Sequence, residues 1–571
     1  MIKPSRSNTS LVTFTVCSNG IPIDPSFRVI SIYVCKEVNH IGSAKLVIAV
    51  DNLNVSNAAE MQSDVFIPGR EIRIDAGYGD NKTIYEGVVT SHNLQISRNT
   101  GATLHIECRD YVFPATLSRK NNVFREMKDA DIIKQILAQY PLSNVTVAPT
   151  YVNNESLVQY YCSDWDFLLS RADANGLVVI SDGKSIQVVK PDVTSPAAIT
   201  LAYGSDIIAF NGTLDSSAQT TGVDAVAWDA AAQQVVTVSG DMPVVNNQGN
   251  ITPAKLAGTY QQNTILQTTT AAEQTLKSWA DAQWFKSAIG RYKGTITFQG
   301  IVVAPGSIIE LKGLGARFDG DAYIGAVVHE IAEGNWYTTA TMGISPSNHA
   351  GENQLPAVPA SGLLPGTQGL QIGKVLGIEN DPTGEARIQV EIPLLNDIGN
   401  TIWARLATFW AGDEHGAFFI PDVGDEVVLG FFNDDPSHAV VLGSLYSSNK
   451  TPGHQLTSEN QIRSLISRTG IKIVFDDEKR NLTFSASGSK IVLSDSGISI
   501  ESADKLVLSA ATGIEINAGT SLAIEGKSGI KMKGANIEAS ADMAFTAKGN
   551  VEAELSAAGQ VTVKGAMVII N

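Results

Sequence analysis

The chain has few cysteines and no long apolar run. Its 571 residues include four cysteines, which are scattered and form no C-x-x-C pair. They predict neither a disulfide framework nor a zinc site, and are typical of thiols in a reducing compartment. No stretch reaches the roughly 18 apolar residues of a membrane helix, and the first residues lack the apolar core of a signal peptide. We therefore expect a protein made in the cytoplasm that leaves it only through a dedicated machine.

Positive charge is also scarce. The 41 Lys and Arg residues are outnumbered by 58 Asp and Glu residues, which gives a formal net charge of −17. Such a chain repels phosphate backbones and anionic membrane surfaces, so nucleic acid is a poor partner. The length is too great for one hydrophobic core and predicts three or four domains.

The first 350 residues are predicted to be mostly β. Short alternating strands broken by Gly, Asn and Asp run from Leu11 to about Arg109 and resume after residue 176. Helices are predicted at 127–140, 163–176 and 271–288. Ser163 and Asp166 have capping-box spacing, and Gly176 is placed as a C-terminal stop. These features predict a base domain at residues 1–350 that is barrel-like or sandwich-like, with a few packed helices. A Pro-, Gly- and Ser-rich linker is predicted at 351–368.

Residues 369–446 predict a small closed barrel. Five short strands, at 370–378, 385–393, 401–407, 425–432 and 439–446, suit a Greek-key barrel of the OB type. OB barrels often bind single-stranded nucleic acid through a basic groove, but this segment has three basic and twelve acidic residues. Trp403, Phe409 and Trp410 are therefore interpreted as barrel core or as contacts between copies.

The composition changes after Tyr446, because Trp and Tyr disappear and no His follows His454. Apolar pairs then recur every eight residues, and each pair predicts a short strand with one apolar face, followed by a small-residue turn. One unit cannot bury its own face. A single-chain β-helix with three units per coil satisfies this pattern, as does a prism in which three chains each supply one strand per layer. We predict a neck at 447–469 and a needle at 470–571. The predicted core residues are Ile498, Ile500, Leu506, Leu508, Ile514, Ile516, Leu522, Ile524, Ile530 and Met532.

Two clusters in the barrel segment could carry chemistry. The run Asp413, Glu414 and His415 has the residue types of a metal or acid–base site, and so does the stretch 433–438. Both lie in Gly- or Pro-containing stretches between predicted strands, where Asp, Asn and His commonly stabilise turns. Neither has a companion nucleophile or ligand set. We therefore expect no catalytic residue, no cofactor and no metal site.

The barrel segment resembles a known family. The stretch "PDVGDEVVLGFFNDDPSHAVVLGSLY", residues 421–446, is similar to the OB domain of VgrG, the spike protein of type VI secretion. It also resembles the spikes of phage tails and extracellular contractile injection systems. Stretches such as "FIPGREIRIDAGYGDNKTIYEGVV" resemble the phage hub-like half of the same family. The motif residues in the barrel are Trp403, Arg405, Pro421, Gly424, Asp425, Glu426 and Gly443.

This resemblance implies a homotrimer, and hence the three-chain prism. The implied fold class is mainly β, with a hub of β-barrels and a few helices, an OB-fold barrel and a C-terminal intertwined triple-stranded β-helix. The implied protein is a non-enzymatic spike that sits on a hexameric inner tube among baseplate proteins. It pierces a target membrane mechanically and carries effectors. A PAAR-type tip protein would dock on Val568, Ile569, Ile570 and Asn571.

Two alternatives remain open on the residues alone. A cell-wall hydrolase could use the carboxylates near His415, and a glycan-binding adhesin could carry the repeat as a solenoid stalk. The resemblance favours the spike, made in the bacterial cytoplasm without a signal peptide and delivered by contraction.

Overall fold

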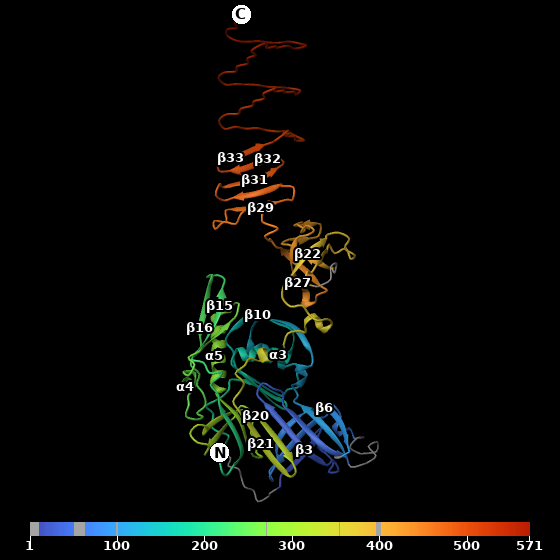
Figure 1. Ribbon diagram of the computed structural model, residues 1–571, viewed down its shortest axis with the longest axis vertical. Coiled ribbons are helices and arrows are strands. Elements are labelled where there is room, and N and C mark those ends of the chain that lie inside the picture. The colour runs from blue at the N-terminus through green and yellow to red at the C-terminus, as the bar shows by residue number, and fades with distance from the viewer. Residues whose placement is uncertain are drawn as a thin grey trace. The chain divides into compact units, whose positions relative to one another are not determined.

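The computed structural model describes residues 11–50, 63–98, 101–269, 271–352, 355–394 and 401–570 (Figure 1). The chain divides into two compact units, Met1–Leu445 and Tyr446–Asn571. The structure is mostly β and contains a closed five-stranded barrel, so the predicted fold class is confirmed at this level.

A 13-stranded sheet forms the base of the first unit. One half of the sheet contains β1 (Thr13–Ser18), β2 (Ile21–Pro22), β3 (Val29–Glu37), β4 (Ser43–Val50), β5 (Glu71–Gly77), β6 (Lys82–Ser97) and β7 (Gly101–Arg109). The other half contains β13 (Ile199–Ala202), β14 (Ile207–Leu214), β18 (Tyr292–Gln299), β19 (Ile308–Lys312), β20 (Gly320–Ala332) and β21 (Asn335–Met342). Strand β20 pairs antiparallel with β3, with Val328 opposite Cys35, and joins the two halves edge to edge.

Each half of this sheet has its own hydrophobic core. Alternate residues of β4, such as Leu46 and Ile48, lie in the first core, while Ile296 and Ile324 lie in the second. This period of two is the pattern expected of strands with one buried face. The base therefore consists of two β modules that share one sheet.

Smaller elements complete the base domain. The sheets are β8 (Arg119–Lys128) with β10 (Asn153–Ser163), β9 (Asn144–Val147) with β11 (Val178–Asp182) and β12 (Ser185–Val189), and β15 (Gly222–Asp229) with β16 (Gln234–Ser239) and β17 (Asn263–Gln267). The helices are α2 (Asp129–Leu137), α3 (Asp164–Ala174), α4 (Pro253–Ala257), α5 (Glu273–Ile289) and α6 (His349–Glu352).

The three helices predicted from the sequence are α2, α3 and α5. At the start of α3, Ser163 Oγ accepts a hydrogen bond from the Asp166 backbone N–H at 3.1 Å. Gly176 follows the helix with a φ of +64°, a conformation that glycine adopts without steric cost. The capping signals in the sequence therefore located this helix correctly.

A buried ion pair connects helices α3 and α5 to the chain that leaves the base. The Lys286 ammonium of α5 donates to Asp173 of α3 at 2.5 Å, and both side chains are almost fully buried. The second oxygen of Asp173 accepts the backbone N–H of His349 at 2.7 Å. The His349 ring lies 2.9 Å from Asp166, so two residues of α3 hold the segment that follows β21.

The predicted OB barrel is present. It consists of β22 (Gln371–Gly377), β23 (Ile388–Glu391), β24 (Thr401–Leu406), β27 (Glu426–Phe431) and β28 (Ala439–Ser444), in the closed order β22-β23-β24-β28-β27. Val375, Val390, Val427 and Leu429 fill its interior. A short hairpin, β25 (Ala411–Gly412) with β26 (His415–Gly416), lies in the connection between β24 and β27.

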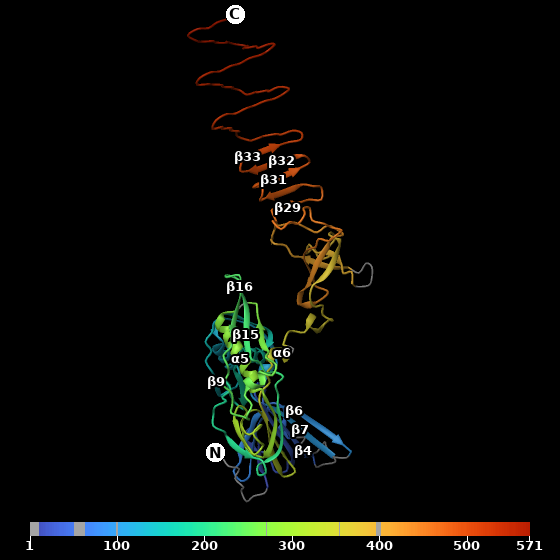
Figure 2. The ribbon, with the colours of Figure 1, turned by 60° about the vertical axis from the view of Figure 1, so that its left-hand side comes forward.

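The second unit begins with a five-stranded antiparallel sheet. Its strands are β29 (Ile462–Ile466), β30 (Lys472–Asp476), β31 (Asn481–Ala486), β32 (Ser489–Ser494) and β33 (Gly497–Glu501), each paired with the next. The first strand thus lies inside the stretch predicted as a neck. From residue 502 to 570 the chain continues as an open zigzag in which no strand pairs with another (Figures 1 and 2).

The Lys286 ion pair should contribute strongly to the stability of the base. Replacing Lys286 with Met leaves the buried Asp173 carboxylate without its cation, which costs about 3–5 kcal/mol. We expect a loss of this size in chemical denaturation followed by tryptophan fluorescence. The matched control is Lys277→Met in the same helix, which breaks the more exposed pairs of Lys277 with Asp281 and Asp241. This control should cost at most about 1 kcal/mol. Equal losses of stability in Lys286→Met and Lys277→Met would contradict the conclusion that the buried Lys286–Asp173 pair contributes strongly to stability.

Stability should also fall on mild acidification, because of His329. This ring is 2% exposed and lies 3.0 Å from the Thr338 hydroxyl; burial lowers its pKa to about 3 from 6.5. Between pH 7.5 and 5.5 the unfolded chain binds a proton here that the folded chain does not, which costs about 1 kcal/mol. His329→Gln should remove that loss in denaturation curves at the two pH values.

Asp110 provides a control of opposite sign. Burial raises the pKa of this carboxyl to about 6 from 3.8, so the folded chain takes up a proton here between pH 7.5 and 5.5. Acidification therefore stabilises the fold through Asp110, and Asp110→Asn should make the acid-induced loss larger. If His329→Gln and Asp110→Asn changed the pH dependence in the same direction, the burial argument would be wrong.

Candidate interaction surfaces

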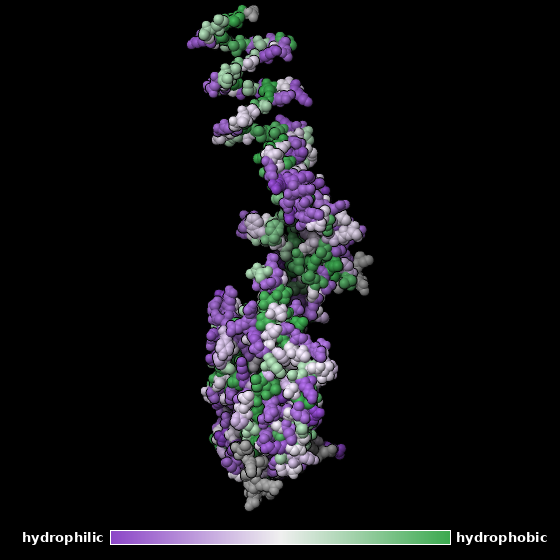
Figure 3. Space-filling model, turned by 90° about the vertical axis from the view of Figure 1, so that its left-hand side faces the viewer, coloured by the Kyte–Doolittle hydropathy of each residue, from purple (hydrophilic) through white to green (hydrophobic). Residues whose placement is uncertain are grey.

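The predicted needle-core residues are uncovered in the single chain. All ten lie between residues 498 and 532, and their exposed fractions run from 52% for Ile500 to 73% for Met532. Figure 3 shows hydrophobic surface along these turns. Exposed apolar residues in such a regular series are not what a monomeric protein presents to water.

The β29–β33 sheet shows how these residues are arranged. Directly opposite residues in an antiparallel sheet lie on the same face of the sheet. One face of the β29–β33 sheet carries two rows of side chains, and each row crosses all five strands. One row is Leu465, Ile473, Phe484, Ile491 and Ile500, and the other is Arg463, Phe475, Leu482, Leu493 and Ile498. Nine of these ten side chains are apolar. The middle row of the opposite face is Ser464, Val474, Thr483, Val492 and Ser499.

In the described residues after Glu501, the backbone lacks strand pairing and the apolar side chains lie uncovered. Residues 502–570 are described throughout and contain no strand pairing; the backbone bond from Gly529 N to Gly526 O closes one turn. Strand backbones need hydrogen-bond partners, and the apolar pairs that follow Ile500 keep the eight-residue repeat. The C-terminal unit therefore offers both an unpaired backbone and an uncovered apolar face.

The predicted tip-docking residues lie at the end of this zigzag. Val568, Ile569 and Ile570 are 50%, 74% and 91% exposed, and Asn571 lies outside the described residues. Their exposure makes them accessible to a partner.

The family motif of the barrel has a structural explanation. The Gly424 N–H donates to Val375 O at 2.8 Å, and Val375 N–H donates to Asp425 O at 2.9 Å. Gly424 has a φ of +90°, which a residue with a side chain rarely adopts. Glu426 begins β27, so this turn leads the chain into the strand that closes the barrel on β22. Gly443 lies opposite Val428 in the β27–β28 pair.

The remaining motif residues are less buried. Trp403 and Arg405 lie on β24, where Trp403 is half-buried and Arg405 is exposed. Pro421 is half-buried just before the Gly424 turn. None of the motif residues meets a titratable partner set that would suggest catalysis.

The Asp413–His415 cluster is a hairpin turn. Ala411 pairs with Gly416 and Gly412 with His415, which leaves Asp413 and Glu414 as the two turn residues. Glu414 has a φ of +58°, and the His415 ring lies 2.7 Å from the Asp413 backbone oxygen. All three are exposed, as the turn interpretation predicts.

The stretch 433–438 is likewise a turn after β27. Asp435 accepts the backbone N–H of Ser437 at 2.8 Å, and the His438 ring lies 3.0 Å from the same carboxylate. The backbone bond at Ser437 is the main reason that the pKa of Asp435 is lowered. Among the described residues, no group of three or more His, Cys, Asp or Glu side chains could hold a metal ion.

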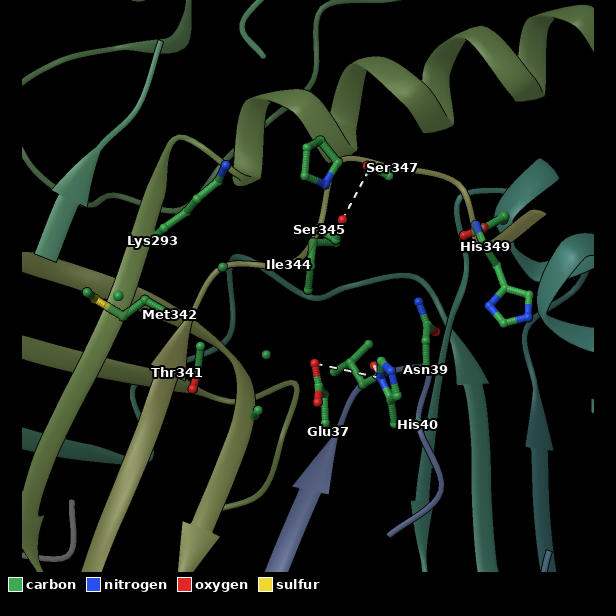
Figure 4. Close-up of a pocket in the computed structure, with 17 residues that line it drawn as sticks. Glu37, Asn39, His40, Lys293, Thr341, Met342, Ile344, Ser345, Ser347 and His349 are labelled. Carbon is green, nitrogen blue, oxygen red and sulfur yellow. Dashed lines mark hydrogen bonds and ion pairs between the residues drawn. The ribbon is translucent and has the colours of Figure 1, made fainter. Parts of the chain in front are cut away.

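A cavity of about 470 Å³ lies in the base domain, where the end of β3 meets β18, β20 and β21 (Figure 4). Glu37 and His40 lie next to each other at the end of β3 on one wall of the cavity, with 3.7 Å between the carboxylate and the ring (Figure 4). The other charged groups at its wall are already paired: Lys293 with Asp215, and Asp173 with Lys286. These ion pairs engage Asp173 and Lys293, two of the charged groups that line the cavity.

The sequence left Trp403, Phe409 and Trp410 as barrel core or as contacts between copies, and the structure excludes the first option for two of them. Phe409 and Trp410 do not belong to the barrel core, because they are 84% and 56% exposed. Phe418 and Phe419, which were not singled out from the sequence, are 87% and 63% exposed. All four flank the β25–β26 hairpin, so the run of aromatics on both sides of the Gly-Asp-Glu-His turn was the available signal.

Two family models match the chain. One, described as the Alg8 N-terminal domain, matches residues 8–333; the other, described as the type VI secretion system/phage-baseplate injector OB domain, matches residues 371–446. The second range coincides with the closed barrel. Among the described residues, no helix is both long and apolar enough to cross a membrane.

Curated relatives match over shorter stretches. The type VI secretion spike protein VgrG3 of Vibrio cholerae is 26% identical over 25% of this chain and 16% of its own length. VgrG5 of Pseudomonas aeruginosa is 34% identical over 15% of this chain and 11% of its own length. The actin cross-linking toxin VgrG1 of Vibrio cholerae is 30% identical over 16% of this chain and 9% of its own length. The chain thus spans less than a fifth of each of these relatives.

A solved type VI secretion component from E. coli, c3393, covers 75% of this chain and 99% of its own, with 13% identity and a TM-score of 0.40. The first family match spans more than half of the sequence, and the second spans the whole barrel. The chain therefore belongs to the Alg8 N-terminal domain family, carries an injector OB domain at residues 371–446, and is similar over shorter stretches to VgrG spike proteins.

Proposed function

We propose that three copies of this chain form a non-enzymatic spike at the tip of a contractile injection apparatus. The observation that carries the proposal is the C-terminal unit, where an apolar sheet face leads into a strand repeat with no partner in its own chain. Three copies supply what one copy lacks. Their β29–β33 faces can close into a dry triangular core, and their later strands can pair with one another.

The inner rows favour a trimer with a narrow core. Side chains of Leu, Ile and Met predominate among the inward residues from Leu482 to Met532, with Phe484 as an exception. Aliphatic side chains fit a slim column, whereas a ligand channel would need polar or small inner positions. About a dozen strands stacked at roughly 4.7 Å would make a rod on the order of 55 Å, longer than the roughly 30 Å hydrocarbon core of a bilayer. Such a rod is suited to piercing a target membrane mechanically.

The base domain suits attachment to a tube of higher symmetry. Each chain contributes two β modules in one sheet, so three chains present six similar modules. This arrangement supports docking on a hexameric inner tube and among baseplate proteins. The ion-pair network around Lys286 holds the exit of the chain from the base, where force passes toward the barrel.

The far end of the repeat is proposed to hold a PAAR-type tip protein. Val568, Ile569 and Ile570 are exposed, and the last layer of a strand stack presents unpaired backbone groups. Effector cargo would travel with this tip. Delivery outside the producing cell would follow from contraction, as the type VI relatives are secretion spikes by name.

The trimer can be tested by substituting one inward residue of the repeat. Leu522→Asp would bury three carboxylates in the dry core, and burial of unpaired charge is strongly unfavourable. We expect the wild-type chain to sediment as a trimer of the 60.6 kDa protomer and to run as an SDS-resistant band, and Leu522→Asp to abolish both.

The matched control is the adjacent outward residue. Ala523→Asp places the same charge on the solvent side and should leave the trimer intact. A wild-type chain that stays a monomer at micromolar concentration, or equal sensitivity of the two positions, would overturn the proposal.

A further inference from the structure

We propose that the OB barrels of neighbouring copies bind each other head to tail, with the aromatic hairpin of one barrel on the outer wall of the next. The aromatic hairpin is defined by Phe409, Trp410, Phe418 and Phe419. The outer wall is defined by Ile372, Leu376, Val428 and Leu442. This inference rests on the proposed trimer and adds a specific contact to it.

The aromatic hairpin is poorly supported by its own chain. The register of β25 with β26 places Phe409 opposite Phe418, next to the Trp410–Ala417 backbone bond. These two phenylalanines are 84% and 87% exposed. The ladder itself is only two residue pairs long, which is marginal in water without packing. A partner that covers the four rings would stabilise the hairpin.

The outer wall lies on the strands that close the barrel. Ile372 of β22 pairs with Val428 of β27, and the Leu442 side chain of β28 lies over Gly430 of β27. Ile372 and Leu442 are 53% and 50% exposed, while Val375 and Leu429 on the same strands point into the core. Lys374 of β22 lies between Ile372 and Leu376 on this wall, opposite Glu426 of β27. The strands β23 and β24 present Gln389, Glu391, Trp403 and Arg405 outward. The wall is thus an apolar patch that contains one pair of opposite charges.

Two different apolar patches per barrel fit a three-fold ring. In a cyclic trimer each contact joins unlike patches, so every copy needs one of each; a two-fold dimer would need a single self-complementary patch. Hydrophobic surface is visible over the barrel in Figure 3. Four exposed aromatic rings offer on the order of 500 Å², which approaches one partner's share of a standard interface.

The segment that connects the barrel to the C-terminal unit makes a second copy of the chain the expected partner of the aromatic hairpin. The connection from Ser444 to Ile462 can span at most about 60 Å, so three barrels whose C-terminal units share one core stay within that reach. Their mutual concentration is on the order of millimolar, at which even a weak patch contact is occupied.

Cross-linking between copies tests this contact. Two differently tagged full-length chains are co-expressed, one with Phe418→Cys and the other with Leu442→Cys, and treated with a short bismaleimide. We expect a covalent dimer that contains both tags. The matched control replaces Leu442→Cys with Glu385→Cys, an exposed position before β23, and should give little product. The wild type corrects for the four native cysteines.

The outcomes separate this inference from the trimer itself. A monomer by sedimentation overturns the proposed spike and with it the contact. A trimer that gives no Phe418–Leu442 product, or that joins two Phe418→Cys chains instead, overturns the head-to-tail contact alone. Maleimide should also label Phe418→Cys several-fold more slowly in the trimer than in the Leu522→Asp background. Equal rates would show that the hairpin is free for another protein, and would overturn the contact as well.

Discussion

The backbone of residues 502–570 has no strand partner in its own chain. The structure of the C-terminal unit depends on where these N–H and C=O groups find hydrogen-bond partners. Backbone N–H and C=O groups that leave water without pairing carry a large free-energy cost. Hydrogen bonding and apolar burial therefore point to the same solution here, which is association with further copies. In the β29–β33 sheet the strands already pair within one chain, so only the apolar face remains to be covered by such an association.

The change in pairing after Glu501 divides the C-terminal unit into two physically different parts. In the sheet, each copy satisfies its own backbone and needs neighbours for side-chain burial alone. In the zigzag, both backbone and side chains need neighbours. The proposed needle would accordingly be held at its start by apolar contact and farther along by hydrogen bonds between copies, a combination that resists bending and unwinding.

The base domain has a different physical character. Its 13-stranded sheet encloses two cores, and one of its buried ionic networks, formed by Lys286, Asp173 and the His349 backbone, joins separate elements. The base domain has hydrophobic cores formed within one chain. In the proposed spike it would serve as a platform, while the C-terminal unit would complete its packing through association with further copies.

Local sequence signals located several elements correctly. The Ser163–Asp166 spacing marked the start of α3, and alternation with glycines at the bends marked the five barrel strands. The Asp-Glu turn between Gly412 and His415 was also anticipated as a turn. The sequence left Phe409 and Trp410 as barrel core or as contacts between copies, because aromatic residues in a short β segment often fill its core; only the three-dimensional path of the connection shows that they lie outside the core.

The sequence by itself determined the eight-residue repeat, the acidic character of the barrel and the strand periodicities, because each depends on residue types at fixed local spacing. Only the tertiary structure decided that the two halves of the base share one sheet through β20 and β3. It also decided that nine apolar side chains gather on one face of β29–β33, and that the hairpin aromatics are left uncovered by their own chain. These features depend on which distant segments pair, and pairing between distant segments is set by packing that local spacing does not encode.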